Sequence, residues 1–234
     1  MKVTIDDIAV QVEAGATVLD AARAAGVHIP TLCHYEGRPA LGACRVCVVE
    51  VEGARTLCAA CATPATDDMV VRTNSVQARE ARRTVVELLL SEHDGNCQVC
   101  DRSEDCELKR IAHQLGIRDV RYAGTRTAGG CDASTPALVR DAGKCIKCRR
   151  CVTVCNEVQQ VGALFPQNRG FATVIGPAFA GGLGDAVCVQ CGQCAATCPT
   201  GAITENSHID QVWKALHDPK AFVVVQTAPA IRAA

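Results

Sequence analysis

The sequence is poor in aromatic side chains, in long apolar runs and in excess charge of either sign. Aromatic residues make up 3% of the 234 residues although hydrophobic residues make up 48%, so that much of the apolar content is Ala and Cys. No stretch approaches the roughly 18 apolar residues that a membrane-spanning helix needs. The start of the chain, interrupted by Asp6 and Asp7, lacks the apolar core of a secretory signal. These absences predict a cytoplasmic protein without a membrane span.

The balanced charge and the absence of nucleotide-binding motifs exclude two further classes of protein, those that bind nucleic acids and those that bind nucleotides. Lys and Arg total 24 and Asp and Glu total 25, for a net charge of −1, whereas a nucleic-acid-binding protein needs a basic face. Neither a G-x-G-x-x-G fingerprint after a strand nor a G-x-x-x-x-G-K-[ST] loop occurs. We also find no plausible nucleophile–base set. We therefore expect no nucleic-acid partner, no bound nucleotide and no catalytic site in these residues.

Cysteine is the residue present in excess, with 17 in the chain. In a secreted protein this density would indicate disulfides. Without a secretory signal, thiols that bind metal are favoured, and the disulfide interpretation stays as a weak alternative. Bound metal would also stabilise a chain with few bulky side chains, because the free energy of binding metal becomes free energy of folding.

The first 74 residues alternate between strand and helix patterns in the order of a β-grasp fold. Apolar residues alternate on either side of the polar turn Asp6-Asp7, and Thr17 is placed to cap an Ala-rich helix that Gly26 ends. The expected elements are strands over 3–5, 9–12, 46–51 and 69–71 and a helix over 18–25. Further along, we expect helices over 75–91, 106–115 and 210–217 and a buried strand over 222–226.

Two near-identical cysteine runs carry the most specific signal. They read Cys145-x2-Cys148-x2-Cys151-x3-Cys155 and Cys188-x2-Cys191-x2-Cys194-x3-Cys198-Pro199. Three closely spaced thiolates reach three irons of a 4Fe-4S cluster, and the fourth cysteine binds the other cluster in two-cluster ferredoxins. The predicted sets are Cys145, Cys148, Cys151 with Cys198, and Cys188, Cys191, Cys194 with Cys155. Zinc sites, the alternative, use cysteines in pairs rather than triplets.

Two other groups have metal-ligand spacing. His93-x3-Cys97-x2-Cys100-x5-Cys106 has three cysteines, and a neutral imidazole would complete a set of four for a 4Fe-4S cluster. Cys33-x10-Cys44-x2-Cys47-x13-Cys61 suits a 2Fe-2S cluster. There Cys61 is favoured over Cys58 because it lies just before residues 62–64 (ATP), which lead into the closing strand. Cys58 and Cys131 are left over, most simply as small structural thiols.

Together these patterns predict an α+β protein with three iron–sulfur domains. The predicted parts are a β-grasp 2Fe-2S domain (1–74), a small helical 4Fe-4S domain with one histidine and three cysteine ligands (75–121), a Gly- and Thr-rich connector (122–136), a two-cluster 4Fe-4S ferredoxin-like domain (137–218) and a C-terminal strand and tail (219–234). The predicted cofactors are one 2Fe-2S and three 4Fe-4S clusters.

The order of these motifs resembles a known family. Supporting stretches are residues 41–50 (LGACRVCVVE), 191–194 (CGQC), 198–202 (CPTGA) and 223–232 (VVVQTAPAIR). The chain is similar to the N-terminal iron–sulfur region of [FeFe] hydrogenases, to the iron–sulfur subunits of NAD(P)-linked, including electron-bifurcating, hydrogenases and, less fully, to the N-terminus of the complex I iron–sulfur subunit. The resemblance also supports His93 as a ligand.

The resemblance implies an electron-transfer subunit of an oxidoreductase. Its partners would be a flavoprotein holding FMN and NAD(P) and a catalytic hydrogenase or formate dehydrogenase subunit, with ferredoxin a further candidate. The hydrogen-activating cluster of that family needs additional cysteine motifs that these residues do not contain. The alternatives are the front portion of an [FeFe] hydrogenase polypeptide and, in a different class, a zinc-stabilised interaction module.

Overall fold

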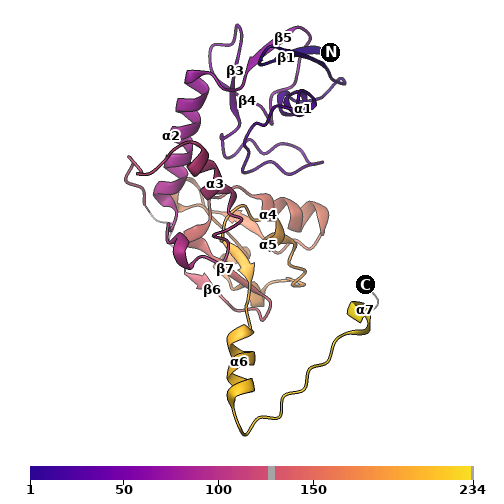
Figure 1. The fold of residues 1–234 in the computed structure, drawn as a ribbon, viewed down its shortest axis with the longest axis vertical. Helices are drawn as coiled ribbons and strands as arrows, with labels where there is room; N and C mark the ends of the chain where they lie inside the picture. The colour runs from indigo at the N-terminus through magenta and orange to yellow at the C-terminus, as the bar shows by residue number, and fades with distance from the viewer. Residues whose placement is uncertain (126–129, 233–234) are drawn as a thin grey trace.

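The computed structural model describes residues 1–125 and 130–232. The N-terminal sheet lies at one end of the long axis, α2 runs beside it toward the middle, and the C-terminal segment lies at the other end (Figure 1). Four residues of the expected connector, 126–129, and the last two of the tail, 233–234, lie outside the described residues. None of the described helices is both long enough and apolar enough to cross a membrane.

The first part is a five-stranded sheet with one helix packed on it, in the order β2-β1-β5-β3-β4. The elements are β1 (Lys2–Ile5), β2 (Ile8–Gln11), α1 (Val18–Ala24), β3 (Val48–Val51), β4 (Cys58–Ala59) and β5 (Met69–Arg72). Asp6 and Asp7 make the tight β1–β2 turn with positive φ angles of 45° and 70°. Thr17 caps α1 in a reciprocal capping box with Asp20. With β1 and β5 parallel, this is the predicted β-grasp fold.

Apolar residues from the sheet and α1 form the core of this first part. Val3 and Ile5 of β1, Val18 of α1 and Val71 of β5 are fully buried, and Leu19 is 2% exposed. Burying one such side chain contributes about 1.5–3 kcal/mol. The β-grasp part therefore holds a conventional apolar core in addition to its cysteines.

The second part consists of two packed helices and a loop. They are α2 (Val76–Glu92), a 3₁₀ turn (Cys97–Val99) and α3 (Glu107–Gln114). Ser75 caps α2 by accepting a hydrogen bond from the Ala78 amide at 3.3 Å. On α2, Ala78, Arg82 and Val86 are buried at spacings of four residues, so that one stripe faces inward and contains an arginine.

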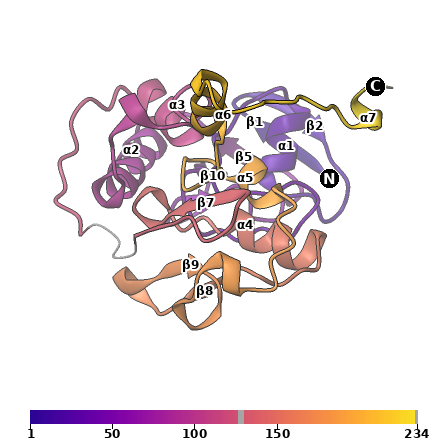
Figure 2. The ribbon, with the colours of Figure 1, turned by 90° about the horizontal axis from the view of Figure 1, so that it is seen from below.

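The third part is built from two short helices, a three-stranded sheet of order β10-β7-β6 and a β8–β9 hairpin. Its elements are β6 (Cys131–Asp132), β7 (Leu138–Asp141), α4 (Arg150–Thr153) continuing as a π-helical turn (Val154–Val158), β8 (Phe165–Gln167), β9 (Val174–Gly176), α5 (Gln193–Thr197) and β10 (Ile203–Glu205). Four 3₁₀ turns join them (Ala142–Lys144, Gly170–Ala172, Ala178–Ala180 and Leu183–Asp185). Figure 2 shows the β8–β9 hairpin on the opposite side of the molecule from α3.

The end of the expected connector is part of this sheet. Cys131 and Asp132 form β6, which pairs antiparallel with Asp141 and Arg140 of β7. The Gly- and Thr-rich composition pointed to irregular structure. The strand forms because β7 offers its backbone as a partner, which local composition does not reveal.

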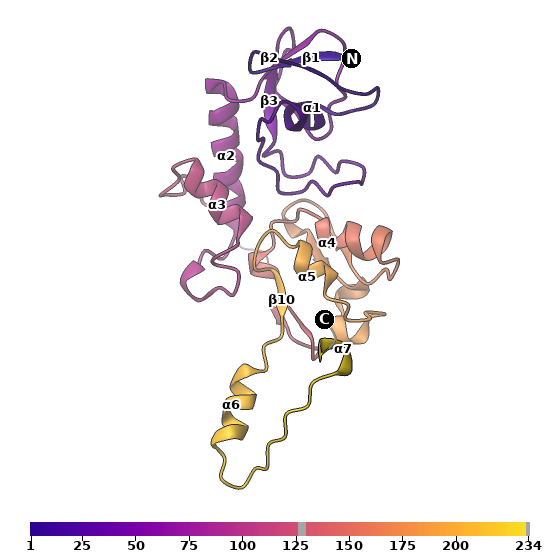
Figure 3. The same ribbon diagram turned by 45° about the vertical axis from the view of Figure 1, so that its right-hand side comes forward.

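The buried strand expected over 222–226 is wrong for this structure. The segment between α6 (Ile209–His217) and α7 (Pro229–Arg232) is extended but pairs with no strand among the described residues, and Phe222 is 94% exposed and Val225 85% exposed. Figure 3 shows α6 extending away from the rest of the fold and this segment turning back from the end of α6 toward α7. The segment is apolar, but within the described ranges no strand or apolar surface covers it.

Candidate metal centres

The four cysteines of the β-grasp part come together in its interior. Cys33, Cys44, Cys47 and Cys61 are between 1% and 5% exposed, and the sulfurs of Cys47 and Cys61 lie 3.4 Å apart. Hydrogen bonds, the stronger from Cys44 and the weaker from Cys61, hold the pKa of Cys33 well below its usual range. The same hydrogen bonds raise the pKa values of Cys44 and Cys61. Four buried thiols that compete for protons in this way would release them on binding an iron–sulfur cluster, whose irons would take the place of those protons.

Cys58 does not join this group. It lies in β4, and its sulfur points to the Thr56 carbonyl oxygen at 3.7 Å. Cys61 lies beyond β4, where the chain turns back toward the Cys33 loop. The structure thus places Cys61, and not Cys58, beside Cys33 and Cys47.

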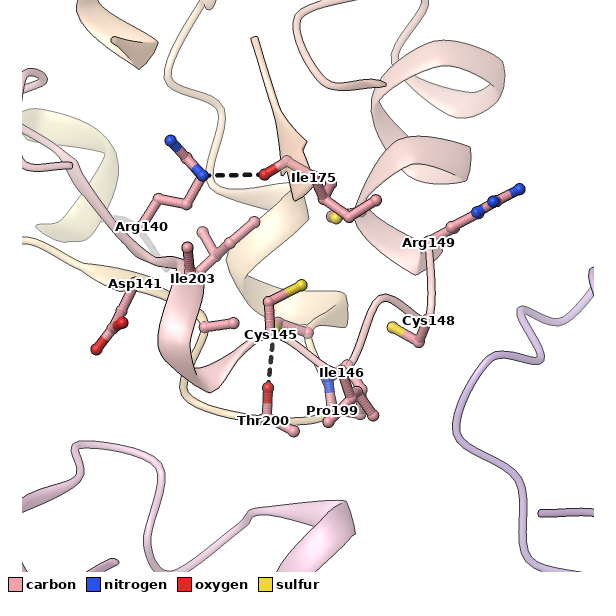
Figure 4. A pocket seen from close by; sticks show the side chains of 14 residues that line it. Arg140, Asp141, Cys145, Ile146, Cys148, Arg149, Ile175, Pro199, Thr200 and Ile203 are labelled. Carbon is pink, nitrogen blue, oxygen red and sulfur yellow. Dashed lines mark hydrogen bonds between the residues drawn. The ribbon is translucent and has the colours of Figure 1, made fainter. Parts of the chain in front are cut away.

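The two duplicated runs exchange their fourth cysteines. Cys145, Cys148 and Cys151 line one cavity together with Cys198, beside the apolar side chains of Ile146, Ile175 and Ile203 (Figure 4). A second cavity is lined by Cys188, Cys191 and Cys194 together with Cys155. Each triplet therefore lies with the distant cysteine of the other run, in the arrangement expected from the spacing.

Backbone amides in both runs point at cysteine sulfur. The Lys147 amide donates to the Cys145 sulfur and the Gln190 amide to the Cys188 sulfur, each at 3.4 Å. Lys147 and Gln190 have matching positive φ angles of 57° and 56°. This left-handed turn, uncommon for residues other than glycine, aims the amide at the preceding cysteine. Such donors stabilise negative charge on sulfur.

Burial opposes that charge when no metal is bound. It raises the pKa of Cys145 to about 11 and the pKa of Cys148 to about 12. In the second cavity, burial raises the pKa of Cys194 to about 11. These thiols are protonated at neutral pH on their own, so that binding a metal at either cavity must release protons.

The third group is less tightly assembled. His93, Cys97 and Cys106 line one open hollow beside α3. The Cys100 sulfur instead packs against the third part, where a Cβ added to Gly201 would lie 2.6 Å from it. The structure thus brings three of the predicted ligands to one hollow and places the fourth against the third part.

The His93 ring is prepared to bind a metal. Burial lowers its pKa, which favours the neutral imidazole that metals bind. One side of the ring hydrogen-bonds to the Lys144 backbone, and Nδ1 is buried without a partner among the described residues. Cys106 occupies the N-cap of α3, where the helix terminus favours negative charge, although burial raises its pKa.

Disulfides and single metal ions fit these sites poorly. All 17 cysteines are free thiols. Within residues 1–125 and 130–232, no three His, Cys, Asp or Glu side chains converge closely enough to hold one ion. Zinc requires four donors at about 2.0–2.3 Å. The wider spacing of the two crossed sets suits a cluster of several irons, whose ligands bind at separate corners.

Two charged groups close to these sites were not predicted from the sequence. Arg150 forms a two-bonded ion pair with Glu107, at 2.6 and 3.0 Å, which joins the third part to the residue after Cys106. Arg82 is 6% exposed and donates to the carbonyl oxygens of Val46 and Val48, on either side of Cys47. Its place on the apolar stripe of α2 was the available signal, whereas no local pattern marks the Arg150–Glu107 pair.

Comparison with known families identifies three iron–sulfur modules, in the same order along the chain as the three parts of the fold. Residues 1–76 match the 2Fe-2S iron–sulfur cluster binding domain, residues 82–121 the NADH-ubiquinone oxidoreductase-G iron–sulfur binding region, and residues 144–202 the 4Fe-4S dicluster domain. Fold and sites therefore define an iron–sulfur protein with 2Fe-2S and 4Fe-4S binding regions.

Individual relatives show which kind of iron–sulfur protein this chain resembles. The whole chain is 50% identical to the NADP-reducing hydrogenase subunit HndD of Solidesulfovibrio fructosivorans and spans 41% of that protein. Over 87% of its length it is 41% identical to an NADH-quinone oxidoreductase subunit of Rhizobium meliloti, spanning 24% of it. A solved chain of an NAD⁺-reducing [NiFe]-hydrogenase matches with a TM-score of 0.82 at 33% identity, covering 88% of this chain and 87% of that one. The chain belongs to this family of iron–sulfur subunits, shared by NAD(P)-linked hydrogenases and complex I-like enzymes.

Proposed function

We propose that this chain relays electrons inside an NAD(P)-linked hydrogenase assembly, between a flavoprotein that holds FMN and NAD(P) and a partner that performs the catalysis. The observation that carries the proposal is the crossed pair of cysteine sets around two separate apolar cavities. The names of the relatives supply the setting, since they describe NADP-reducing and NAD⁺-reducing hydrogenases. When bound, iron–sulfur clusters supply sites that accept and release one electron.

The proposed ligands account for 15 of the 17 cysteines and one histidine. A 2Fe-2S cluster is assigned to Cys33, Cys44, Cys47 and Cys61. Three 4Fe-4S clusters are assigned to His93, Cys97, Cys100 and Cys106, to Cys145, Cys148, Cys151 and Cys198, and to Cys155, Cys188, Cys191 and Cys194.

The protein's contribution to such a relay is to hold the sites at fixed separations and to exclude water. One buried apolar cluster contains Leu32 and Val46 from the first part, Val86 and Leu108 from the second and Ile146 from the third. Glu107 adds a backbone bond from its amide to the Pro199 carbonyl at 2.9 Å. These contacts join all three parts and fix the positions of the sites relative to one another in this structure. No side chain is assigned a proton-transfer or group-transfer role.

A second candidate is that these residues form the front portion of a longer [FeFe] hydrogenase polypeptide. It is favoured by the match to HndD, which covers this whole chain but only 41% of that protein. The uncovered apolar segment around Phe222 also suits it. The mass of the native subunit separates the two candidates, and identifying the chains that co-purify separates a hydrogenase from a formate dehydrogenase assembly.

The proposal is tested by counting iron and acid-labile sulfide in anaerobically purified protein. One 2Fe-2S and three 4Fe-4S clusters contain about 14 of each per chain. We expect values near that number and a brown protein. A colourless protein with stoichiometric zinc would replace the proposal with a zinc-stabilised interaction module.

Replacing His93 by Cys tests the assignment of the imidazole. We expect His93→Cys to retain a 4Fe-4S cluster with a lower reduction potential, because a thiolate adds negative charge that a neutral imidazole lacks. An EPR-monitored redox titration measures this potential. His113→Gln, at an exposed histidine on the same hollow, is the matched control and should leave the potential unchanged. An unchanged potential in His93→Cys would show that His93 is not a ligand.

A further inference from the structure

Arg82 is a buried cation held by backbone oxygens. Its Nε donates to the Val46 carbonyl at 3.0 Å, and one Nη donates to the carbonyls of Val48 at 3.0 Å and Thr73 at 3.1 Å. The side chain comes from α2 of the second part, whereas all three acceptors belong to the first part. Arg82 thus reaches across the boundary between the parts and binds the backbone on either side of Cys47.

Across residues 1–125 and 130–232, no carboxylate forms an ion pair with Arg82, although its neighbour Arg83 pairs with Glu87 at 3.0 Å. A buried charge is costly unless an opposite charge compensates it. Carbonyl oxygens satisfy the N–H donors but carry no net charge. Burial lowers the pKa of Arg82, negative charge at Cys47 opposes that lowering, and the positive charge of Arg79 adds to it.

We infer that Arg82 is the counter-charge of the centre at Cys33, Cys44, Cys47 and Cys61, and that it raises the reduction potential of the 2Fe-2S cluster proposed there. The inference rests on the proposed function. Such a cluster with four thiolates has a net negative charge, which grows by one on reduction. A fixed buried cation stabilises the more negative, reduced form more than the oxidised form.

This arrangement links the reduction potential of the cluster in the first part to the packing of α2 from the second part. Because the guanidinium belongs to α2, its distance from Cys47 depends on how α2 packs against β3. The contact that docks the second part therefore also sets the driving force for electron transfer at the first. Arg82 acts here as a positioning and charge-setting residue, since it binds the carbonyl oxygens of the residues on either side of Cys47 and not a substrate.

The test compares Arg82→Lys with Arg82→Gln, which both retain a donor but differ in charge. Each variant is purified anaerobically as the full chain, and its 2Fe-2S EPR signal is titrated against potential. We expect Arg82→Gln to lower the ratio of reduced to oxidised cluster at least tenfold at a fixed potential, which is a shift of about 59 mV. Arg82→Lys should stay near the wild type. Arg79→Gln, an exposed arginine one turn earlier on α2, is the control and should change little.

The result that would overturn the inference is an equal shift in the Lys and Gln variants, or no shift in either. An absent 2Fe-2S signal in the wild type would instead remove the proposed cluster, so that the two failures are distinguishable. If Arg82→Gln loses the signal by misfolding, amide hydrogen exchange of β3 provides a second measurement. The loss of β3 protection caused by Arg82→Met is measured twice, once in the chain that holds the cluster and once in Cys61→Ser, which lacks it. We expect the smaller loss in Cys61→Ser. Equal losses would contradict any coupling between Arg82 and the cluster.

Discussion

Cys198→Ser is expected to remove the cluster assigned to Cys145, Cys148 and Cys151 while the cluster at the remainder of its own run persists. The reason is geometric, because the Cys198 side chain lines the cavity of the other triplet. Serine preserves the size of the side chain but replaces the soft thiolate that iron–sulfur clusters use. EPR spectra and iron analysis should show the loss of one 4Fe-4S cluster, about 4 of about 14 irons per chain.

Cys155→Ser is the matched control for this substitution. Its sulfur lies with Cys188, Cys191 and Cys194, so that the opposite cluster should disappear. Cys131→Ser, at an exposed cysteine of β6 outside every proposed site, should leave both clusters intact. If Cys198→Ser instead removed the cluster of its own run, ligation would follow the order of the chain and the crossed assignment would be wrong.

Removal of iron is expected to unfold the third part while the β-grasp sheet remains folded. The buried cluster of the third part is built around cysteines, with Cys151, Cys194 and Cys198 packed among Leu138 and Leu164. Its helices α4 and α5 have only four and five residues, too short to be stable on their own. We therefore expect bound metal to supply a large share of the free energy of folding there.

The β-grasp part has an apolar core of its own, formed by residues such as Val3, Ile5 and Leu19. Amide hydrogen exchange after anaerobic chelation should therefore show β7, α4, α5 and β10 without protection and β1 and β5 still protected. Iron and sulfide added back should restore the lost protection. Simultaneous loss from β1 and β7 would show that the shared apolar cluster makes the three parts a single cooperative unit.

Local patterns in the sequence were sufficient for most of the secondary structure of the first two parts, but not for the strands of the third part. Alternating apolar residues predicted β1, β2 and β5, and Thr17 predicted the start of α1, because these signals act within a few residues of one another. The same holds for α2 and α3, whose caps at Ser75 and Cys106 lie at the expected boundaries. The short strand β6 was not predicted because the partner that stabilises it, β7, is not visible in its own composition.

The sequence by itself determined which thiols can share a site. A CxxCxxC triplet is a short segment, so its sulfurs must lie on one loop, and the duplication supplied the reason to expect exchanged fourth cysteines. Only the tertiary structure decided what surrounds those thiols. The charge of Arg82 beside Cys47, the Arg150–Glu107 pair and the contact of Cys100 with Gly201 each join residues far apart along the chain. Such contacts depend on how whole domains pack, and electrostatic and packing energies follow distance in space, which spacing along the chain does not encode.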